Sequence, residues 1–135
     1  MARSIFVSHE VVQETLSSVP ARGKNLLEPL KSLAVNHALP FQILEDVEVT
    51  NAAETHEHEG DLWQCLEGEV TFVCGGKLVN PEKHPKKAGE WKGSRIEGGT
   101  EYVLKSGDWL WIPAGQPHLH KTDSTARLVI VKIPK

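Results

Sequence analysis

The chain has 135 residues, of which 39% are hydrophobic and 24% charged, so it is long enough for one globular domain around one hydrophobic core. Its net charge of -3 and pI of about 6.2 argue against a nucleic-acid-binding or membrane-surface protein. The longest apolar runs are too short to span a bilayer, and the N-terminus lacks the apolar stretch of a signal peptide. We therefore expect a cytoplasmic protein.

Residues 1–40 are predicted to form a short, partly helical N-terminal extension. The stretch SHEVVQETLSSV (8–19) offers Ser8 as a helix N-cap, followed by a partial apolar stripe. Residues 25–35 fit either a second short helix or an extended arm, since Pro29 disfavours the helix. The leucines of this segment exceed what a lone barrel can bury. We therefore expect a homodimer in which they pack across a two-fold axis.

The residue pattern of 41–135 predicts an all-β domain. Short runs rich in Val, Ile, Leu and Trp alternate with clusters of Gly, Pro, Asn and Asp, which is typical of many strands joined by turns. Turns are expected at Gly75–Gly76, at 106–108 and at 122–124. The polar stretch 80–99 fits neither a strand nor a simple turn. It is interpreted either as a disordered excursion or as an ordered loop over the barrel mouth, with Trp91 favouring the ordered loop.

The segment THEHEGD (55–61) places two histidines two residues apart among carboxylates. Residues i and i+2 of a strand share a face, so His56 and His58 are expected to project into one space, with Asp61 close by. Imidazoles that converge in this way suit a transition metal. The pattern alone also fits a solvated acidic loop, and the glutamates at 54, 57 and 59 are expected to form a solvated rim.

A second cluster lies in GDWLWIPAGQPHLHKT (107–122). Its Pro and Gly residues predict a rigid turn that delivers His118 onto the next strand, as a metal ligand requires. His120 shares the face of His118, and its ordinary pKa range suits general acid–base catalysis. The alternatives for His120 are a hydrogen-bond donor that supports the metal ligands and an ordinary satisfied histidine at the barrel edge.

These two clusters together resemble the two signature motifs of the cupin superfamily. The first family motif places an acid after His-x-His and then a glycine, as in His56, His58, Asp61 and Gly68; the second runs through Gly107, Pro113 and Gly115 to His118. The resemblance covers roughly residues 41–133. Asp61 stands where the family has glutamate, and Thr122 where it has asparagine. The resemblance implies a double-stranded β-helix, or jelly-roll barrel, with one divalent transition metal (Fe, Mn, Ni or Zn) on His56, His58, Asp61 and His118.

Such a metal site implies an enzyme acting on a small organic molecule. The leading hypothesis is a dioxygenase of an enol, diketone or diphenol. A metal-dependent isomerase, lyase or cyclase that uses His120 or Asp61 for proton transfer is the first alternative, and a non-catalytic small-ligand-binding cupin is the second, because one fold carries many functions. We expect Trp63 and Cys65 to point inward and shape the cavity.

Overall fold

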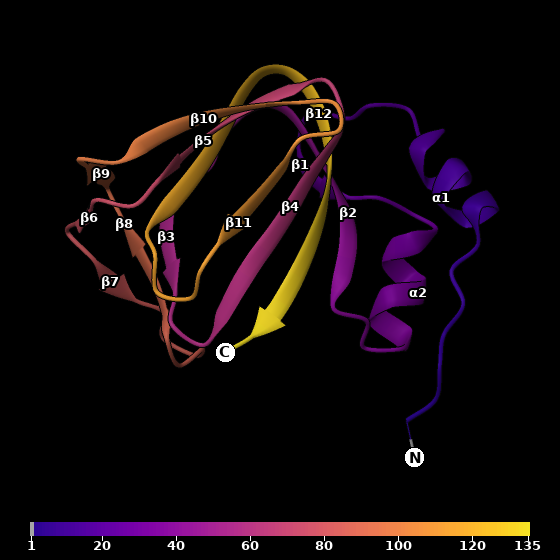
Figure 1. Ribbon diagram of the computed structural model, residues 1–135, viewed down its shortest axis with the longest axis horizontal. Coiled ribbons are helices and arrows are strands. Elements are labelled where there is room, and N and C mark those ends of the chain that lie inside the picture. The colour runs from indigo at the N-terminus through magenta and orange to yellow at the C-terminus, as the bar shows by residue number, and fades with distance from the viewer. Residues whose placement is uncertain (1) are drawn as a thin grey trace.

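The computed structural model describes residues 2–135 and consists of two short helices and twelve strands (Figure 1). Within that range, neither helix has the length and apolar character needed to cross a membrane. The elements run in the order α1 (His9–Leu16), β1 (Gly23–Leu26), α2 (Leu30–Asn36), β2 (Phe41–Thr50), β3 (Ala53–His56), β4 (Glu59–Glu67), β5 (Glu69–Cys74), β6 (Lys77–Val79), β7 (Glu82–Lys83), β8 (Glu90–Gly93), β9 (Arg95–Glu97), β10 (Thr100–Lys105), β11 (Trp109–Ile112) and β12 (His118–Pro134). The all-β prediction with a helical extension is confirmed.

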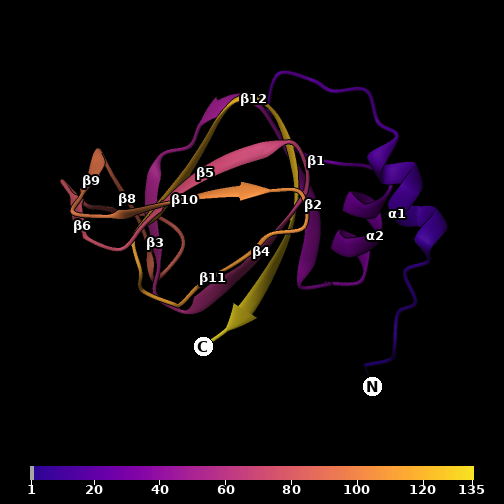
Figure 2. The same cartoon turned by 45° about the horizontal axis from the view of Figure 1, so that its top comes forward.

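The N-terminal extension packs against the outside of the barrel, where α2 lies beside β2 and α1 packs against α2 (Figures 1 and 2). Ser8 caps α1 as predicted, and its side chain accepts a hydrogen bond of 3.2 Å from the Val11 amide. The segment 25–35 contains both predicted conformations, because β1 ends at Leu26 and α2 begins at Leu30. Leu27 and Leu30 are buried with Ile43 in a small core of their own, so one chain already buries part of the apolar surface that predicted a dimer.

A buried ion pair fastens this extension to the sheet. Arg127 on β12 donates to Glu45 on β2 at 2.7 Å, and both side chains are almost fully buried. The Arg127 guanidinium also donates to the backbone carbonyls of Leu16 and Ser18, while Glu45 accepts from the Ala21 amide at 3.0 Å. The chain between α1 and β1 is therefore held by charge-assisted hydrogen bonds as well as by apolar packing.

The long strand β12 links the two faces of the barrel, arching from the side of β3 to the side of β2 (Figure 1). Its first residues, His118 to Lys121, pair with β5, whereas the stretch from Arg127 to Val131 lies between β2 and β4. Its register against β2 shifts between Thr122 and Thr125. The turn predicted at 122–124 is therefore wrong, since the chain makes a bulge there and continues as one strand.

The inner faces of the paired strands meet in one core. Residues directly opposite on neighbouring antiparallel strands point the same way, and the registers align the apolar positions of β2, β12, β4 and β11. The core contains Leu44, Trp63, Cys65, Val70, Phe72, Cys74, Leu104, Ile112, Ala126, Leu128 and Ile130. Trp63 and Cys65 point inward as predicted.

The polar stretch 80–99 is ordered and contains β7, β8 and β9. Strand β8 pairs with β3, and β9 pairs with β6, which follows the Gly75–Gly76 turn. The Trp91 indole N–H donates to the Glu57 carboxylate at 2.7 Å. The segment thus extends the barrel next to β3, which carries the first histidine motif.

Candidate metal centre

Four polar side chains converge where the inner faces of the two motifs meet. Glu54 and His56 are two residues apart on β3 and share its inner face, Asp61 projects from β4, and His118 begins β12. The His118 Nε2 atom lies 3.4 Å from Asp61 Oδ2 and 3.8 Å from Glu54 Oε1. The His56 Nε2 atom lies 3.6 Å from each of the same two carboxylate oxygens. Ligand atoms of Glu54, His56 and His118 all lie within 4.8 Å of one another.

Each imidazole is oriented by a hydrogen bond from its other ring nitrogen. The Nδ1 atom of His56 lies 2.7 Å from Glu90 Oε1, and Nδ1 of His118 lies 3.0 Å from the Gln116 carbonyl oxygen. A carboxylate and a carbonyl only accept, so each Nδ1 carries a proton, and the neutral form of each imidazole would present its Nε2 lone pair to the cluster. Both Nε2 atoms are buried and have no hydrogen-bond partner.

The two carboxylate oxygens of Asp61 have different surroundings. It is 1% exposed, and its Oδ1 atom accepts from the Lys132 ammonium at 2.8 Å. Its Oδ2 atom points toward the histidines, is buried and has no hydrogen-bond partner. Burial raises the pKa of Asp61, but its interactions with His118 and Lys132 outweigh burial, so the pKa is lowered. This carboxylate is therefore ionised at neutral pH.

The charges of the cluster favour a bound cation. Burial raises the pKa of Glu54, but His56, His118 and Lys24 together outweigh it and lower that pKa to about 2. Burial lowers the pKa of His56, while the Glu54 and Asp61 carboxylates outweigh it and the pKa is raised. Two ionised carboxylates thus surround two imidazoles, with three buried ligand atoms unsatisfied.

These donors fit a divalent transition metal. Unpartnered buried polar atoms are costly, and a set of imidazole nitrogens with carboxylate oxygens is the ligand type that Fe, Mn, Ni and Zn accept. The residues that could hold it are Glu54, His56, Asp61 and His118.

The structure does not bring His58 to this cluster. Strand β3 ends at His56 and β4 begins at Glu59, so the strand alternation that predicted a shared face does not extend through residues 57 and 58. The His58 side chain is exposed and lies against Gly89. The shared face expected of His56 and His58 belongs instead to Glu54 and His56, which corrects both that expectation and the expectation that Glu54 is a solvated rim residue.

His120 lies deeper in the barrel on the inner face of β12. It is 1% exposed, and its ring packs at 5.2 Å from the rings of both Trp63 and Phe72. Its Nδ1 atom lies 2.7 Å from Asp46 Oδ2, and its Nε2 atom lies 3.2 Å from the Asn51 amide nitrogen. Both ring nitrogens therefore face protein groups rather than the metal ligands.

A pocket of about 280 Å³ adjoins the cluster. Glu54 and Lys132 line its polar side, and Trp63 forms part of its wall. Glu54 also lines a second pocket of about 380 Å³, which it shares with the basic segment from Glu82 to Lys92. Glu54 is thus the residue of the cluster that lines both pockets.

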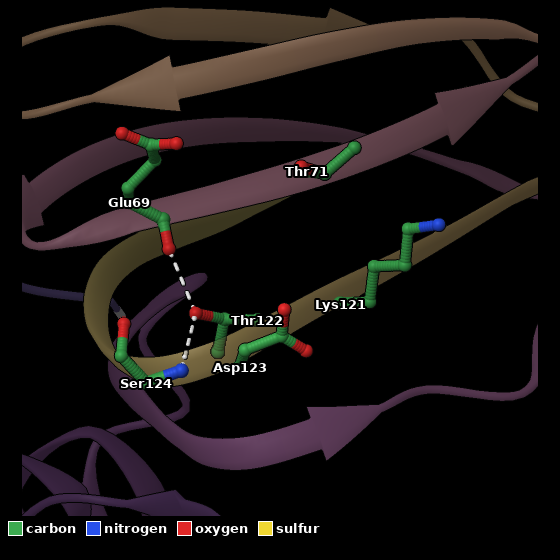
Figure 3. Close-up of a pocket in the computed structure, with 6 residues that line it drawn as sticks. All are labelled: Glu69, Thr71, Lys121, Thr122, Asp123 and Ser124. Carbon is green, nitrogen blue, oxygen red and sulfur yellow. Dashed lines mark hydrogen bonds between the residues drawn. The ribbon is translucent and has the colours of Figure 1, made fainter.

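A pocket of about 450 Å³ lies elsewhere, at the bulge of β12 (Figure 3). Thr122 donates to the Glu69 carbonyl at 2.8 Å and accepts from the Ser124 amide at 3.3 Å, as the dashed lines in Figure 3 show. Its other lining side chains belong to Thr71, Lys121 and Asp123. No unsatisfied buried side-chain atom within residues 2–135 belongs to this pocket, so it lacks the chemistry of the cluster.

Three residues of the centre were missed by sequence reasoning. Glu54 was visible as the i−2 neighbour of His56, and the choice between Glu54 and His58 depended on where the strand ends. Glu90 and Lys132 come from segments with no motif, and only strand pairing places them beside His56 and Asp61.

Comparison with known proteins supports the fold. No protein-family model and no curated protein matches the chain. Among solved structures, hydroquinone 1,2-dioxygenase from Sphingomonas sp. TTNP3 with 4-hydroxybenzoate bound matches with a TM-score of 0.54 and 16% identity, over 91% of this chain and 71% of that one. CENP-C of Drosophila melanogaster bound to CAL1 matches with a TM-score of 0.50 and 14% identity, over 69% of this chain and 60% of that one.

The protein BH2720 from Bacillus halodurans matches with a TM-score of 0.50 and 16% identity, over 70% of this chain and 63% of that one. This chain thus spans less than two thirds of the length of CENP-C and of BH2720. At these identities the likeness concerns the fold. It supports the jelly-roll barrel that the two motifs, through their resemblance to the cupin superfamily, imply.

Proposed function

We propose that this chain is a metal-dependent enzyme that acts on a small organic molecule, and that its reaction is the dioxygenation of an enol, diketone or diphenol. The observation that carries the proposal is the convergence of two unpartnered Nε2 atoms and an unpartnered carboxylate oxygen beside a pocket. Two histidines with a carboxylate and open positions are typical of non-haem Fe(II) oxygenases. The structural likeness to a hydroquinone dioxygenase adds support from the fold alone.

The ligands we propose are His56, His118, Asp61 and Glu54. A divalent metal bound there would supply a Lewis acid and a template that orients substrate and dioxygen. Glu90 and the Gln116 carbonyl hold the two imidazoles in the tautomer that binds metal. These hydrogen bonds fix the orientation of the two imidazole rings, so their Nε2 atoms are in place before metal or substrate binds.

The remaining polar residues of the site have supporting roles in this proposal. Lys132 holds Asp61 so that one carboxylate oxygen stays directed at the imidazoles. The Asp46 carboxylate lies 2.7 Å from His120 Nδ1, and this pairing supports the acid–base role predicted for His120. A His120→Gln variant tests that role, because loss of a titrating group should remove one limb of the pH–rate profile while metal binding is retained.

Metal binding by matched histidine variants tests the proposal. Elemental analysis of the purified protein should find one transition metal per chain, and His56→Ala and His118→Ala should each lower the affinity for Co²⁺ by more than about 100-fold, beyond the usual loss for a supporting residue. His58→Ala is the matched control and should keep a full equivalent at near-normal affinity. If His58→Ala loses metal as His56→Ala does, the three-histidine set of the sequence motif is correct and the ligand set proposed here is wrong.

Oxygen consumption tests the reaction class. Anaerobic loading with Fe(II), followed by measurement of O₂ uptake with a panel of diketones, enols and diphenols, should identify at least one substrate. Turnover without air by protein that holds Zn would favour instead the metal-dependent isomerase, lyase or cyclase, for which the buried pair of His120 and Asp46 is the supporting observation. Binding without turnover under both conditions would favour a ligand-binding cupin.

A homodimer and a cytoplasmic location stay predictions, as do the boundaries of a 1–40 extension and a 41–135 barrel. The outer face of β11 supports an interface, since Trp109 and Trp111 are 59% and 50% exposed on the side opposite to buried Ile112. Light scattering at micromolar concentration should give twice the chain mass. A monomeric mass there would contradict the predicted dimer.

A further inference from the structure

Besides Glu54, four polar groups line the pocket of about 280 Å³. In the antiparallel registers Gln42 lies opposite Ile130, and Ile130 lies opposite Trp63, so the three side chains point the same way. Lys132 lies opposite Asp61 on the same face, and Lys24 lies opposite Asp46, four residues along β2 from Gln42. These polar groups therefore enter one hollow from four different strands.

Two of the polar atoms in this wall are buried and unsatisfied. The Trp63 indole is 4% exposed and its Nε1–H has no acceptor, while the Gln42 Oε1 atom has no donor. Burying a donor or an acceptor without a partner costs about 1–3 kcal/mol, so such atoms in a pocket wall indicate a missing partner. A hydroxyl group has the chemistry for both needs, because it can accept from an indole N–H and donate to an amide oxygen.

The rest of the pocket restricts the size and charge of the ligand. Leu26, Leu44 and Ile130 supply apolar wall, and the volume lies just below the usual range of roughly 300–1,000 Å³ for ligand sites, which leaves room for one ring. Lys24 makes no ion pair within residues 2–135, whereas Lys132 is already bonded to Asp61. Lys24 is therefore the cation available to a ligand anion.

We propose that this pocket binds a compact hydroxylated carboxylate with a single ring, its hydroxyl between Trp63 and Gln42 and its carboxylate near Lys24. The inference deepens the proposed function and rests on it, because a ligand seated there lies beside Glu54 and next to the metal centre. It narrows the diphenols of the proposed function to those that also carry a carboxylate.

Calorimetric titration of Zn²⁺-loaded protein with 4-hydroxybenzoate tests the inference without turnover. Benzoate lacks the hydroxyl and 4-hydroxybenzamide lacks the charge, so each should bind about 10-fold more weakly than 4-hydroxybenzoate. Gln42→Leu and Trp63→Phe should abolish the preference for the hydroxyl, and Lys24→Met should abolish the preference for the carboxylate. Lys121→Met, which removes a lysine from the distant pocket of Figure 3, is the matched control and should change neither preference.

Equal affinity for 4-hydroxybenzoate and benzoate, or no heat from any of the three compounds at millimolar concentration, would overturn the inference. A hydroxyl preference that persists in Gln42→Leu and Trp63→Phe would overturn it as well. The same titrations on metal-free His118→Ala protein separate the two proposals. Selective binding there together with absence of metal binding by the wild type would reject the proposed function and leave the ligand class standing.

Discussion

Replacing Arg127 by methionine should destabilise the fold more than any loss of apolar packing at that position would. Methionine keeps much of the apolar stem but removes the guanidinium, which donates to Glu45 and to two backbone carbonyls of the extension. Glu45 is fully buried and would keep only its hydrogen bond from the Ala21 amide. The variant therefore leaves a buried carboxylate without its counter-charge.

The size of the effect follows from that burial. Removing one partner of a buried ion pair costs about 3–5 kcal/mol, whereas replacing both partners by apolar residues is often close to neutral. A domain of this size has a stability of about 5–15 kcal/mol, so the single variant should stay folded with its Tm lowered by about 10 °C or more. The double variant Arg127→Met with Glu45→Leu should recover part of this stability. The recovery should be incomplete, because the two hydrogen bonds from the guanidinium to backbone carbonyls stay lost.

Urea unfolding followed by circular dichroism measures both variants against the wild type. Hydrogen exchange of α1 and α2 in Arg127→Met should show faster exchange there than in the barrel, because the ion pair joins the end of α1 to β2 and β12, and α2 packs against α1. An Arg127→Met midpoint equal to that of the wild type would refute the reasoning. So would a double variant less stable than the single one.

Three further predictions concern the barrel. Cys65 and Cys74 should react very slowly with iodoacetamide at pH 8 in the native protein and rapidly in urea, because both are buried. Burial raises the pKa of Cys74 to about 11, so roughly one Cys74 side chain in a thousand is a thiolate at pH 8. Glu90→Ala should weaken Co²⁺ binding about 10- to 100-fold in calorimetry, and Glu90→Gln, which keeps an acceptor oxygen for the imidazole, should lose less. Gly68→Ala should lower the free energy of unfolding by about 2 kcal/mol or more, since its Cβ would lie 2.0 Å from a backbone carbonyl of β12 at φ +77, whereas Gly107→Ala meets no atom within 4 Å and should cost less.

The barrel and the order of its motifs could be predicted from local patterns. Turn residues and β-branched runs are signals that act within a few residues, and the Pro–Gly turn before His118 acts at that range too. The structure adds that this turn docks on the first motif, because the Gly115 amide donates to the His56 carbonyl at 2.7 Å. Gly115 adopts a φ of +85, which glycine accepts without strain.

Contacts between distant segments could not be predicted from such patterns. Glu90 and Lys132 reach the centre through strand pairing with β3 and β4, and no local signal distinguishes them from other charged residues. The prediction of which residue shares a strand face with His56 was wrong for a different reason. Strand alternation was the right rule, but it was applied in the direction of His58, where the strand has already ended, rather than toward Glu54.

In the ligand set proposed here Glu54 takes the place of His58, which changes the charge of the centre as well as its ligands. Three imidazoles and Asp61 would leave a divalent metal with a net charge of +1, whereas Glu54 in place of His58 adds a second ionised carboxylate and makes the metal site neutral. A neutral site attracts an anionic ligand less strongly than a positive one, because the net Coulomb term is absent. A ligand carboxylate must then be recognised by the protein itself, and Lys24, which lies close enough to lower the pKa of Glu54, is the cation placed for it. The ligand set and the charge preference of the pocket are therefore linked. If His58 rather than Glu54 binds the metal, Lys24→Met should weaken anion binding only slightly, since the metal site would then supply the positive charge.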